Sequence, residues 1–513
     1  MITISKERLR IEDYFRILFE NEKIDIDTAT IEVVEKCHTF LKEFSVNKVI
    51  YGVNTGLGPM AQYRIEPEDQ INLQYNLIRS HASGTGNALS STYVKASMIS
   101  RLKSLSLGYS GIHPDVIHIL ARLINEDIIP FIPEHGGVGA SGDLVQLSHI
   151  ALVLIGEGEV FYKGEKRKTE TVFRELQITP LKIYLREGLG LINGTSVMSG
   201  IGIVNTIRAK QLINWSVMAS AMINEIVQSF DDHFSSELNS TKKHSGQQRI
   251  AKAMRSILSD SSLIEKRSDH LYNGKIEEKI FKQKIQEYYS LRCVPQVLGP
   301  VCDTVKYAEQ ILTDELNSVN DNPVVDVETQ TVYHGGNFHG DYVSFEMDKI
   351  KIAITKLSML AERQLNFLMN NKLNQILPAF VNLGTLGLNL GMQGAQFSAV
   401  STTAENQTLS NPMYIHSIPS NNDNQDIVSM GTNAALMAKK VIENTFEVLA
   451  VEFLSIVQAI DYLQITDKLA SPTKKVYDQL REIVPVFVDD SPKYRELNMI
   501  KEFLLNNNPA AIQ

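Results

Sequence analysis

The sequence has few cysteines and no long apolar run. Of its 513 residues only Cys37, Cys293 and Cys302 are cysteines, an odd number at wide spacing that fits neither a disulfide framework nor a zinc ligand set. No apolar stretch approaches the ~20 residues of a membrane span. The N-terminus carries acidic residues and lacks the apolar core of a signal peptide. We therefore expect a cytoplasmic protein with no membrane partner.

Basic residues are also in deficit. Lys and Arg number 50 against 59 Asp and Glu, which gives a formal net charge of −9. Because phosphate backbones bind clustered Lys and Arg, this balance argues against a nucleic-acid partner. The composition is otherwise ordinary, with 43% hydrophobic and 21% charged residues, and it excludes wholesale disorder.

Proline is absent from three long stretches, which can therefore form long helices. These stretches run from Pro180 to Pro295, from Pro323 to Pro378 and from Pro419 to Pro472. Apolar residues spaced three and four apart between residues 343 and 368 predict one helix face. A second apolar set lies off that face: Phe345, Ile352, Met359 and Phe367. Residues 433–463 show the same periodicity, and helices of this kind are typical of a bundle centre or a subunit interface.

Glycines and short elements, in contrast, mark the first 200 residues. We predict a mainly α fold in which an N-terminal catalytic region, residues 1–200, is followed by a long helical bundle with C-terminal helices, residues 201–513. No linker rich in Ser, Gly or Pro separates the two regions.

The segment from Gly137 to Gly142 formally fits the dinucleotide pattern G-x-G-x-x-G. That pattern requires a preceding strand, and Pro130 and Pro133 argue against a central strand there. No P-loop pattern occurs, so no nucleotide cofactor is expected. The G-x-S-x-G pattern of a nucleophile elbow does not fit either, because the second glycine comes too early. The simplest structural interpretation is a tight turn before a helix over residues 144–155.

The same segment can also form an electrophile from the chain itself. Glycine lacks a side chain, so the nitrogen of Gly142 can approach the carbonyl of Ala140 closely and close a five-membered ring. Loss of two waters would then leave an exocyclic methylidene derived from Ser141.

This segment resembles the signature of the aromatic amino acid lyases, the family of histidine, phenylalanine and tyrosine ammonia-lyases and related aminomutases. Six further segments resemble that family in its own order: Tyr51-Gly-Val-Asn-Thr-Gly-Leu-Gly58, Leu191-Ile-Asn193-Gly-Thr, Tyr289-Ser-Leu-Arg292-Cys, Asn320-Asp-Asn322-Pro, Gly335-Gly-Asn-Phe338-His and Asn424-Gln425-Asp426. Leu57 departs from the family, where phenylalanine is usual. The resemblance implies a built-in cofactor, 4-methylidene-imidazol-5-one (MIO), made from Ala140, Ser141 and Gly142 in the N-terminal region. It also implies a homotetramer with shared active sites and no metal; His334 and His339 lack a third metal ligand.

The resemblance also implies roles for single residues. Tyr51 would be the base that removes the β-proton, and Asn193 and Tyr289 would lie beside the reacting atoms. The implied substrate-binding residues are Gly58, Ser80, His81, Arg292, Phe338, Asn424 and Gln425. A guanidinium such as that of Arg292 suits a carboxylate. Capture of the amine on an electrophile turns it into a better leaving group, and a phenolate base needs a positive charge or hydrogen-bond donors nearby.

Two positions give conflicting indications of the substrate. Ser80-His81 resembles the histidine lyases, whereas Gln425 replaces the glutamate that those enzymes use near the imidazole. A neutral amide suits a phenyl or phenol ring, and His81 can hydrogen-bond a phenol as readily as an imidazole. The chain looks most like bacterial tyrosine ammonia-lyases, so the expected reaction converts L-tyrosine to trans-4-coumarate and ammonia. The alternatives are a histidine ammonia-lyase giving urocanate and a tyrosine 2,3-aminomutase.

Overall fold

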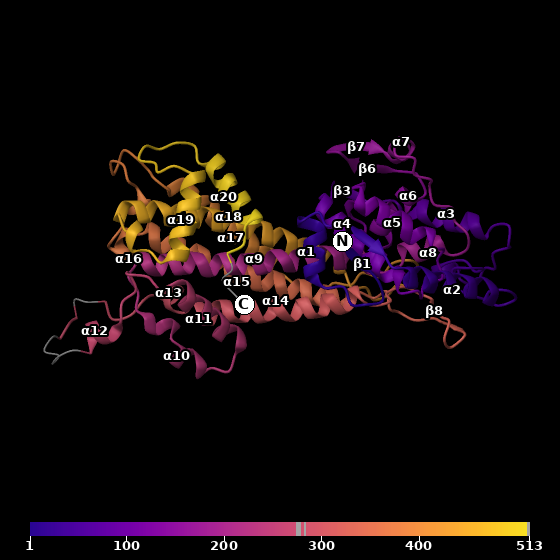
Figure 1. Ribbon diagram of the computed structural model, residues 1–513, viewed down its shortest axis with the longest axis horizontal. Coiled ribbons are helices and arrows are strands. Elements are labelled where there is room, and N and C mark those ends of the chain that lie inside the picture. Colours follow the sequence, from indigo (N-terminus) through magenta and orange to yellow (C-terminus); the bar gives the residue numbers. More distant parts are fainter. Residues whose placement is uncertain (273–278, 282–283, 510–513) are drawn as a thin grey trace. The chain divides into compact units, whose positions relative to one another are not determined.

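Long helices dominate the protein, as a computed structural model of residues 1–272, 279–281 and 284–509 shows (Figure 1). The strands have only two to four residues each, so the predicted mainly α fold is confirmed. In the part of the chain that the structure describes, no helix combines the length and apolarity needed to cross a bilayer.

The chain forms two compact units, each built from three segments. The first comprises Met1–Ile207, Ala308–Asp348 and Pro412–Lys439, and the second comprises Arg208–Tyr307, Lys349–Asn411 and Lys440–Gln513. Four of the five limits between the units fall inside long helices: α9 (Ser196–Ile226), α14 (Val294–Leu316), α15 (Asp341–Met369) and α18 (Gly431–Leu463). The fifth limit, between Asn411 and Pro412, lies in a loop. A division of the chain near residue 200 stays a prediction.

The periodic segments form helices where they are expected. The eight residues of the predicted face all lie in α15 and are fully buried: Val343, Met347, Ile350, Ile354, Leu357, Ala361, Leu365 and Leu368. Of the second apolar set, Phe345 and Ile352 are 49% and 48% exposed. Helix α18 covers the second periodic stretch, residues 433–463. The period of 3.6 residues therefore located both helices correctly.

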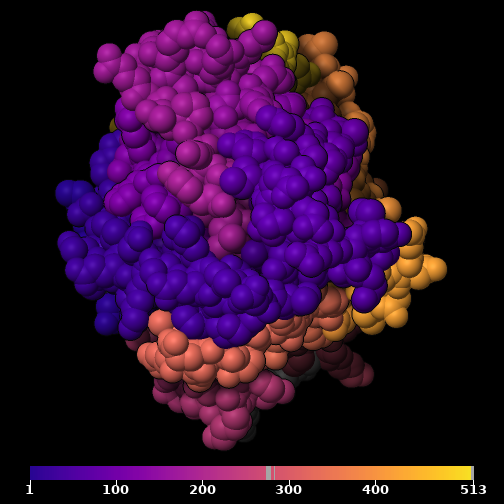
Figure 2. Space-filling view, turned by 90° about the vertical axis from the view of Figure 1, so that its right-hand side faces the viewer, coloured from indigo at the N-terminus to yellow at the C-terminus, as the bar shows by residue number. Residues whose placement is uncertain are grey.

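The first unit combines short strands with a group of packed helices. Its elements besides the long helices are β1 (Ile2–Ile4), α1 (Ile11–Phe19), β2 (Ile24–Ile26), α2 (Thr28–Phe44), η1 (Gly58–Met60), α3 (Gln70–His81), β3 (Thr85–Ala88), α4 (Ser91–Ser106), α5 (Asp115–Asn125), β4 (Ile129–Pro130), β5 (Pro133–His135), α6 (Leu144–Leu154), β6 (Glu159–Tyr162), β7 (Glu165–Lys168), α7 (Thr169–Glu175), α8 (Glu187–Ile192), β8 (Val324–Asp326) and β9 (Thr331–Tyr333). Helices α3, α6 and α8 pack against one another (Figure 1). In Figure 2 the indigo and violet N-terminal part covers most of the visible face of this unit.

The strands of this unit lie in four small sheets. β1 and β2 are parallel, whereas β3–β5, β4–β6–β7 and β8–β9 are antiparallel. In the three-stranded sheet, Ile129 pairs with Phe161 and Pro130 with Val160. Pro130 and Pro133 therefore occupy edge strands, where a missing N–H group is tolerated, and no central strand precedes the glycine-rich turn.

The second unit is almost wholly helical. It contains η2 (Asp231–Phe234), α10 (Ser236–Ser240), α11 (Ser245–Ile257), α12 (Arg267–Leu271), α13 (Tyr289–Arg292), α16 (Asn371–Asn374), η3 (Ala379–Val381), α17 (Gln393–Leu409), η4 (Thr466–Lys468), α19 (Ser471–Ile483) and α20 (Tyr494–Asn506). Its core includes Trp215, whose ring meets that of Phe453 edge-on with 5.5 Å between the centroids. The indole nitrogen donates to the carbonyl of Leu504, 2.9 Å away, so this buried polar group is satisfied.

Candidate active site

The turn at Ala140, Ser141 and Gly142 lies directly before α6 and is held by a second segment of the first unit. Gly142 has φ +74° and pairs with Gly194 in a parallel bridge. A Cβ atom on Gly142 would lie only 1.9 Å from the carbonyl oxygen of Gly194, so only glycine fits. Ala140 is 7% exposed. Cyclisation requires a turn in which the backbone nitrogen of Gly142 is not shielded by a side chain. The residues at this turn meet that requirement and therefore fit MIO.

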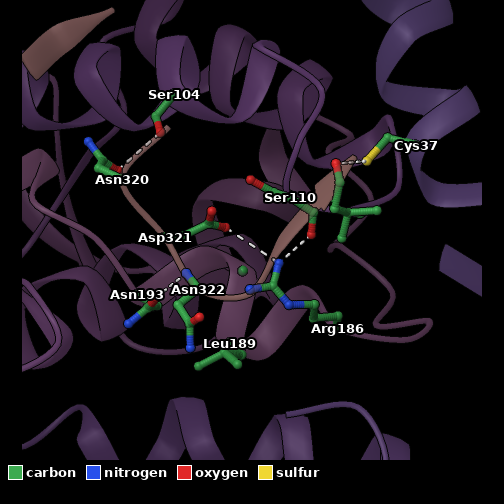
Figure 3. Close-up of polar contacts among 12 residues, drawn as sticks. Cys37, Ser104, Ser110, Arg186, Leu189, Asn193, Asn320, Asp321 and Asn322 are labelled. Carbon is green, nitrogen blue, oxygen red and sulfur yellow. Dashed lines mark hydrogen bonds and ion pairs between the residues drawn. The ribbon is translucent and has the colours of Figure 1, made fainter. Parts of the chain in front are cut away.

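Two donors converge on the carbonyl oxygen of Ser141. The side-chain nitrogen Nδ2 of Asn193 lies 3.1 Å from it, and the backbone nitrogen of Gly194 lies 3.2 Å from it. The side-chain oxygen of Asn193 accepts a hydrogen bond of 2.7 Å from the backbone nitrogen of Asn322 (Figure 3). Because that oxygen is occupied, the amide NH₂ group of Asn193 must face Ser141.

The hydroxyl of Ser141 meets another predicted residue, Gln425. The Nε2 atom of Gln425 lies 3.1 Å from the Oγ of Ser141. Its Oε1 atom accepts from the hydroxyl of Ser420 at 3.3 Å, which fixes the orientation of the amide. Asn424 is exposed, and its backbone nitrogen donates to the carbonyl of Asn421 within the same tight loop. The structure thus brings Gln425, but not the side chain of Asn424, into contact with the turn.

Tyr51 and Gly58 lie at the two ends of one loop and contact each other. The backbone nitrogen of Gly58 donates to the hydroxyl oxygen of Tyr51 at 3.0 Å. Gly58 has φ +56°, and a Cβ there would lie 2.6 Å from the Nδ2 of Asn421. The buried amide of Gln74 anchors the start of the loop, because it donates to the carbonyl of Gly52 at 2.9 Å. The Tyr51 loop is therefore packed against the loop that carries Gln425.

Three other predicted residues of the first unit lie at the end of α3 and in the loop before α15. Ser80 and His81 end α3 and bond locally: the hydroxyl of Ser80 lies 3.0 Å from Nδ1 of His81, and both groups lie within 3.2 Å of the carbonyl of Leu77. Phe338 is half-buried in the loop before α15. Among the described residues, no hydrogen bond joins Ser80 or His81 to Ser141.

Tyr289 and Arg292 belong to the second unit, where they lie side by side. The guanidinium of Arg292 stands 4.8 Å from the ring centroid of Tyr289 and donates to the carbonyl of Glu287 at 2.9 Å. Both line an open pocket of about 650 Å³, together with Tyr288, Arg363 and other residues of the same unit. The arrangement leaves a cation at a pocket wall, where it can bind an anion.

Asp143 is a functional candidate that our sequence reasoning missed. Its carboxylate accepts from the backbone nitrogens of Val197 at 2.8 Å and Met198 at 2.9 Å, in the first turn of α9, and from the hydroxyl of Thr432. Burial raises its pKa to about 6, although these hydrogen bonds act in the opposite direction. An acidic residue directly after Gly142 and before an apolar helix was the signal for it in the sequence.

Comparison with known proteins identifies the family of this chain. The family model described as aromatic amino acid lyase matches residues 9–482, so the chain belongs to that family. A tyrosine 2,3-aminomutase of Myxococcus sp. (strain Mx-B0) is 38% identical over 510 residues, 98% of this chain and 96% of the relative. A histidine ammonia-lyase of Halalkalibacterium halodurans is 36% identical over 497 residues, 97% of this chain and 94% of the relative.

A solved structure agrees with this assignment. The crystal structure of a tyrosine aminomutase from Streptomyces globisporus, 36% identical, matches with a TM-score of 0.93 over 98% of this chain and 96% of that chain. The expected family is therefore confirmed, and the protein is an enzyme of an MIO-dependent lyase and aminomutase family.

The raised pKa of Asp143 predicts a pH-dependent stability. The folded state keeps the proton up to about pH 6, whereas the unfolded carboxyl loses it near its ordinary value of 3.8. Between these pH values the folded state binds more protons than the unfolded state. The contribution of Asp143 to the free energy of unfolding therefore falls by about 3 kcal/mol as pH rises. Urea unfolding of wild type and Asp143→Asn should show the wild type losing stability relative to the variant from about pH 4 to about pH 6. A difference that stays constant across this range would contradict the prediction.

Proposed function

We propose that this enzyme eliminates ammonia from L-tyrosine to give trans-4-coumarate, with MIO formed from Ala140, Ser141 and Gly142. When formed, that group supplies an electrophile to which an amine can add. The observation that supports tyrosine is the position of Gln425 at the turn, where its Nε2 atom lies 3.1 Å from the Ser141 hydroxyl oxygen that leaves as water when MIO forms. This side chain is a neutral amide, and a carboxylate would serve an imidazole substrate better than a phenol.

The residues around the turn have separate tasks in this proposal. Tyr51 removes the β-proton, and the N–H group of Gly58 holds its hydroxyl oxygen in place. Asn193 and Gly194 hold the Ser141 carbonyl through two hydrogen bonds. Arg292 does not belong to the residues around the turn, since it lies in the second unit with Tyr289 beside it; it is the proposed partner of the substrate carboxylate.

A second candidate function is that of a tyrosine 2,3-aminomutase. The observation that favours it is the 38% identity to a relative of that name over 98% of the chain. A histidine ammonia-lyase is the third candidate, supported by Ser80-His81 and by a relative that is 36% identical. All three candidates need the same self-made electrophile, so the products decide between them.

Product analysis provides the direct test. We expect incubation with L-tyrosine to release 4-coumarate and ammonia, measured by absorbance and by chromatography that also resolves β-tyrosine. Parallel incubations with L-phenylalanine and L-histidine serve as controls. Accumulation of β-tyrosine in place of coumarate would establish the aminomutase, and rapid formation of urocanate without coumarate would refute tyrosine as the substrate.

Removal of the proposed base should separate turnover from cofactor formation. Tyr51→Phe lacks the hydroxyl that takes the β-proton, so we expect turnover of tyrosine to fall by about 10²- to 10⁴-fold. Its intact mass should still lack two waters, because Tyr51 does not belong to the cyclising segment. Tyr63→Phe is the matched control, since Tyr63 lies just beyond the same loop and is 69% exposed. Full turnover in Tyr51→Phe would exclude this role.

We also propose a homotetramer. Five apolar residues in and before α17 are 45% to 76% exposed: Leu386, Leu388, Leu390, Phe397 and Val400. Several large apolar side chains left exposed in one short segment favour a protein interface there. Light scattering should give four times the chain mass for the wild type and a smaller species for Phe397→Asp. A wild type with the mass of one chain would refute the tetramer.

A further inference from the structure

Arg101 is a fully buried cation in the first unit, on helix α4. Its side chain is 0% exposed, and its hydrogen bonds go to neutral oxygens, the side-chain oxygen of Asn320 at 3.3 Å and the carbonyl of Gly190. Burial lowers its pKa to about 10, so the guanidinium keeps its charge at neutral pH. The carboxylates of Asp321 and Asp143 act on this charge but make no direct ion pair with it in the part of the chain that the structure describes. A buried arginine that hydrogen-bonds only to neutral oxygens is unfavourable for stability, which suggests that the charge serves another purpose.

The guanidinium is packed directly behind the backbone of Gly194. A Cβ atom on Gly194, which has φ +144°, would lie 2.5 Å from Nη1 of Arg101. The N–H group of the same residue donates to the carbonyl oxygen of Ser141 at 3.2 Å. The positive charge therefore stands behind one of the two donors that converge on this oxygen.

The carbonyl oxygen of Ser141 is where charge develops when this residue loses water. The Cα–H bond breaks and its proton passes to a base; the Cβ–O bond breaks, and the hydroxyl takes up a proton and leaves as water. A Cα–Cβ double bond forms, and no oxidant or reductant is needed. As the Cα–H bond breaks, its electron pair is drawn toward the adjacent carbonyl, so a fixed cation near that oxygen lowers the barrier.

We propose that Arg101 is a positioning residue for formation of the electrophile, whose charge, acting through Gly194, accelerates the loss of water from Ser141. The inference deepens the proposed function, because it assumes that Ser141 is converted at all. It assigns to Arg101 a role in maturation of the enzyme that is separate from substrate binding.

Arg186 offers a contrast inside the same unit. It is also fully buried, but its Nη1 atom lies 3.4 Å from the carboxylate of Asp321, and it donates to the carbonyl of Ser110 (Figure 3). Its charge is compensated at close range. Arg186 and Asp321 also act on the pKa of Arg101, in opposite directions. The double variant Arg186→Met, Asp321→Asn removes both, so it takes away a buried arginine without changing the net charge of the cluster and is the matched control.

The test follows the intact mass of the full chain at intervals after a short induction, alongside its thermal unfolding. In wild type the mass should fall by two waters. Arg101→Met should lose them on the order of 10- to 100-fold more slowly, since a single charge at short range contributes on this scale inside a protein. Arg101→Lys keeps the charge and should mature close to the wild-type rate, as should the double control variant.

A second variant keeps the test decisive if Arg101→Met does not fold. Asn320→Asp places a carboxylate 3.3 Å from Arg101 at almost unchanged shape, so it should slow the loss of water while the arginine stays in place. A folded Arg101→Met or Asn320→Asp that loses both waters at the wild-type rate would overturn the inference. A wild type that keeps its full mass would instead refute the proposed function itself.

Discussion

The site depends on a backbone contact between Gly142 and Gly194. The two residues pair in a parallel bridge, with the nitrogen of Asp143 donating to the carbonyl of Gly194 at 2.8 Å and the nitrogen of Gly194 donating to Ser141 at 3.2 Å. A side chain on Gly142 would collide with the backbone of Gly194, and a side chain on Gly194 would collide with Arg101 and Asn320. The turn that can cyclise is thus held by main-chain atoms, and only glycine fits at either of the two positions.

This contact determines which partners the neighbouring buried polar groups have. Because Gly194 lies just before α9, the carboxylate of Asp143 meets the free N–H groups at the start of that helix. The preceding residue, Asn193, is turned by Asn322 so that it faces Ser141. Because these groups bond to one another, other arrangements of the turn would leave buried polar atoms unpaired, which favours this one arrangement.

The sequence predicted those features that have a local pattern. Helix α15 was located because its buried residues recur every three or four positions, and the turn was located because a run of glycines with one serine is distinctive. The partners of the turn had no such pattern. Asn322 reaches Asn193 across 129 residues, and Arg101 reaches Asn320 across 219. Nearly every residue of α4 is buried, so neither face of that helix singles out Arg101.

Overall similarity does not decide between the lyase and aminomutase outcomes. An aminomutase and a histidine ammonia-lyase are almost equally similar to this chain, at 38% and 36% identity. All candidate reactions would use the same electrophile under the proposed function, so the turn and its supports do not distinguish between them. The difference must arise where the ring of the substrate is bound and where product is retained or released, and loops commonly control such steps. In this chain the Tyr51 loop and the Gln425 loop are packed together at Gly58 and Asn421, so the proposed base and the proposed selectivity residue are carried by loops that share one contact.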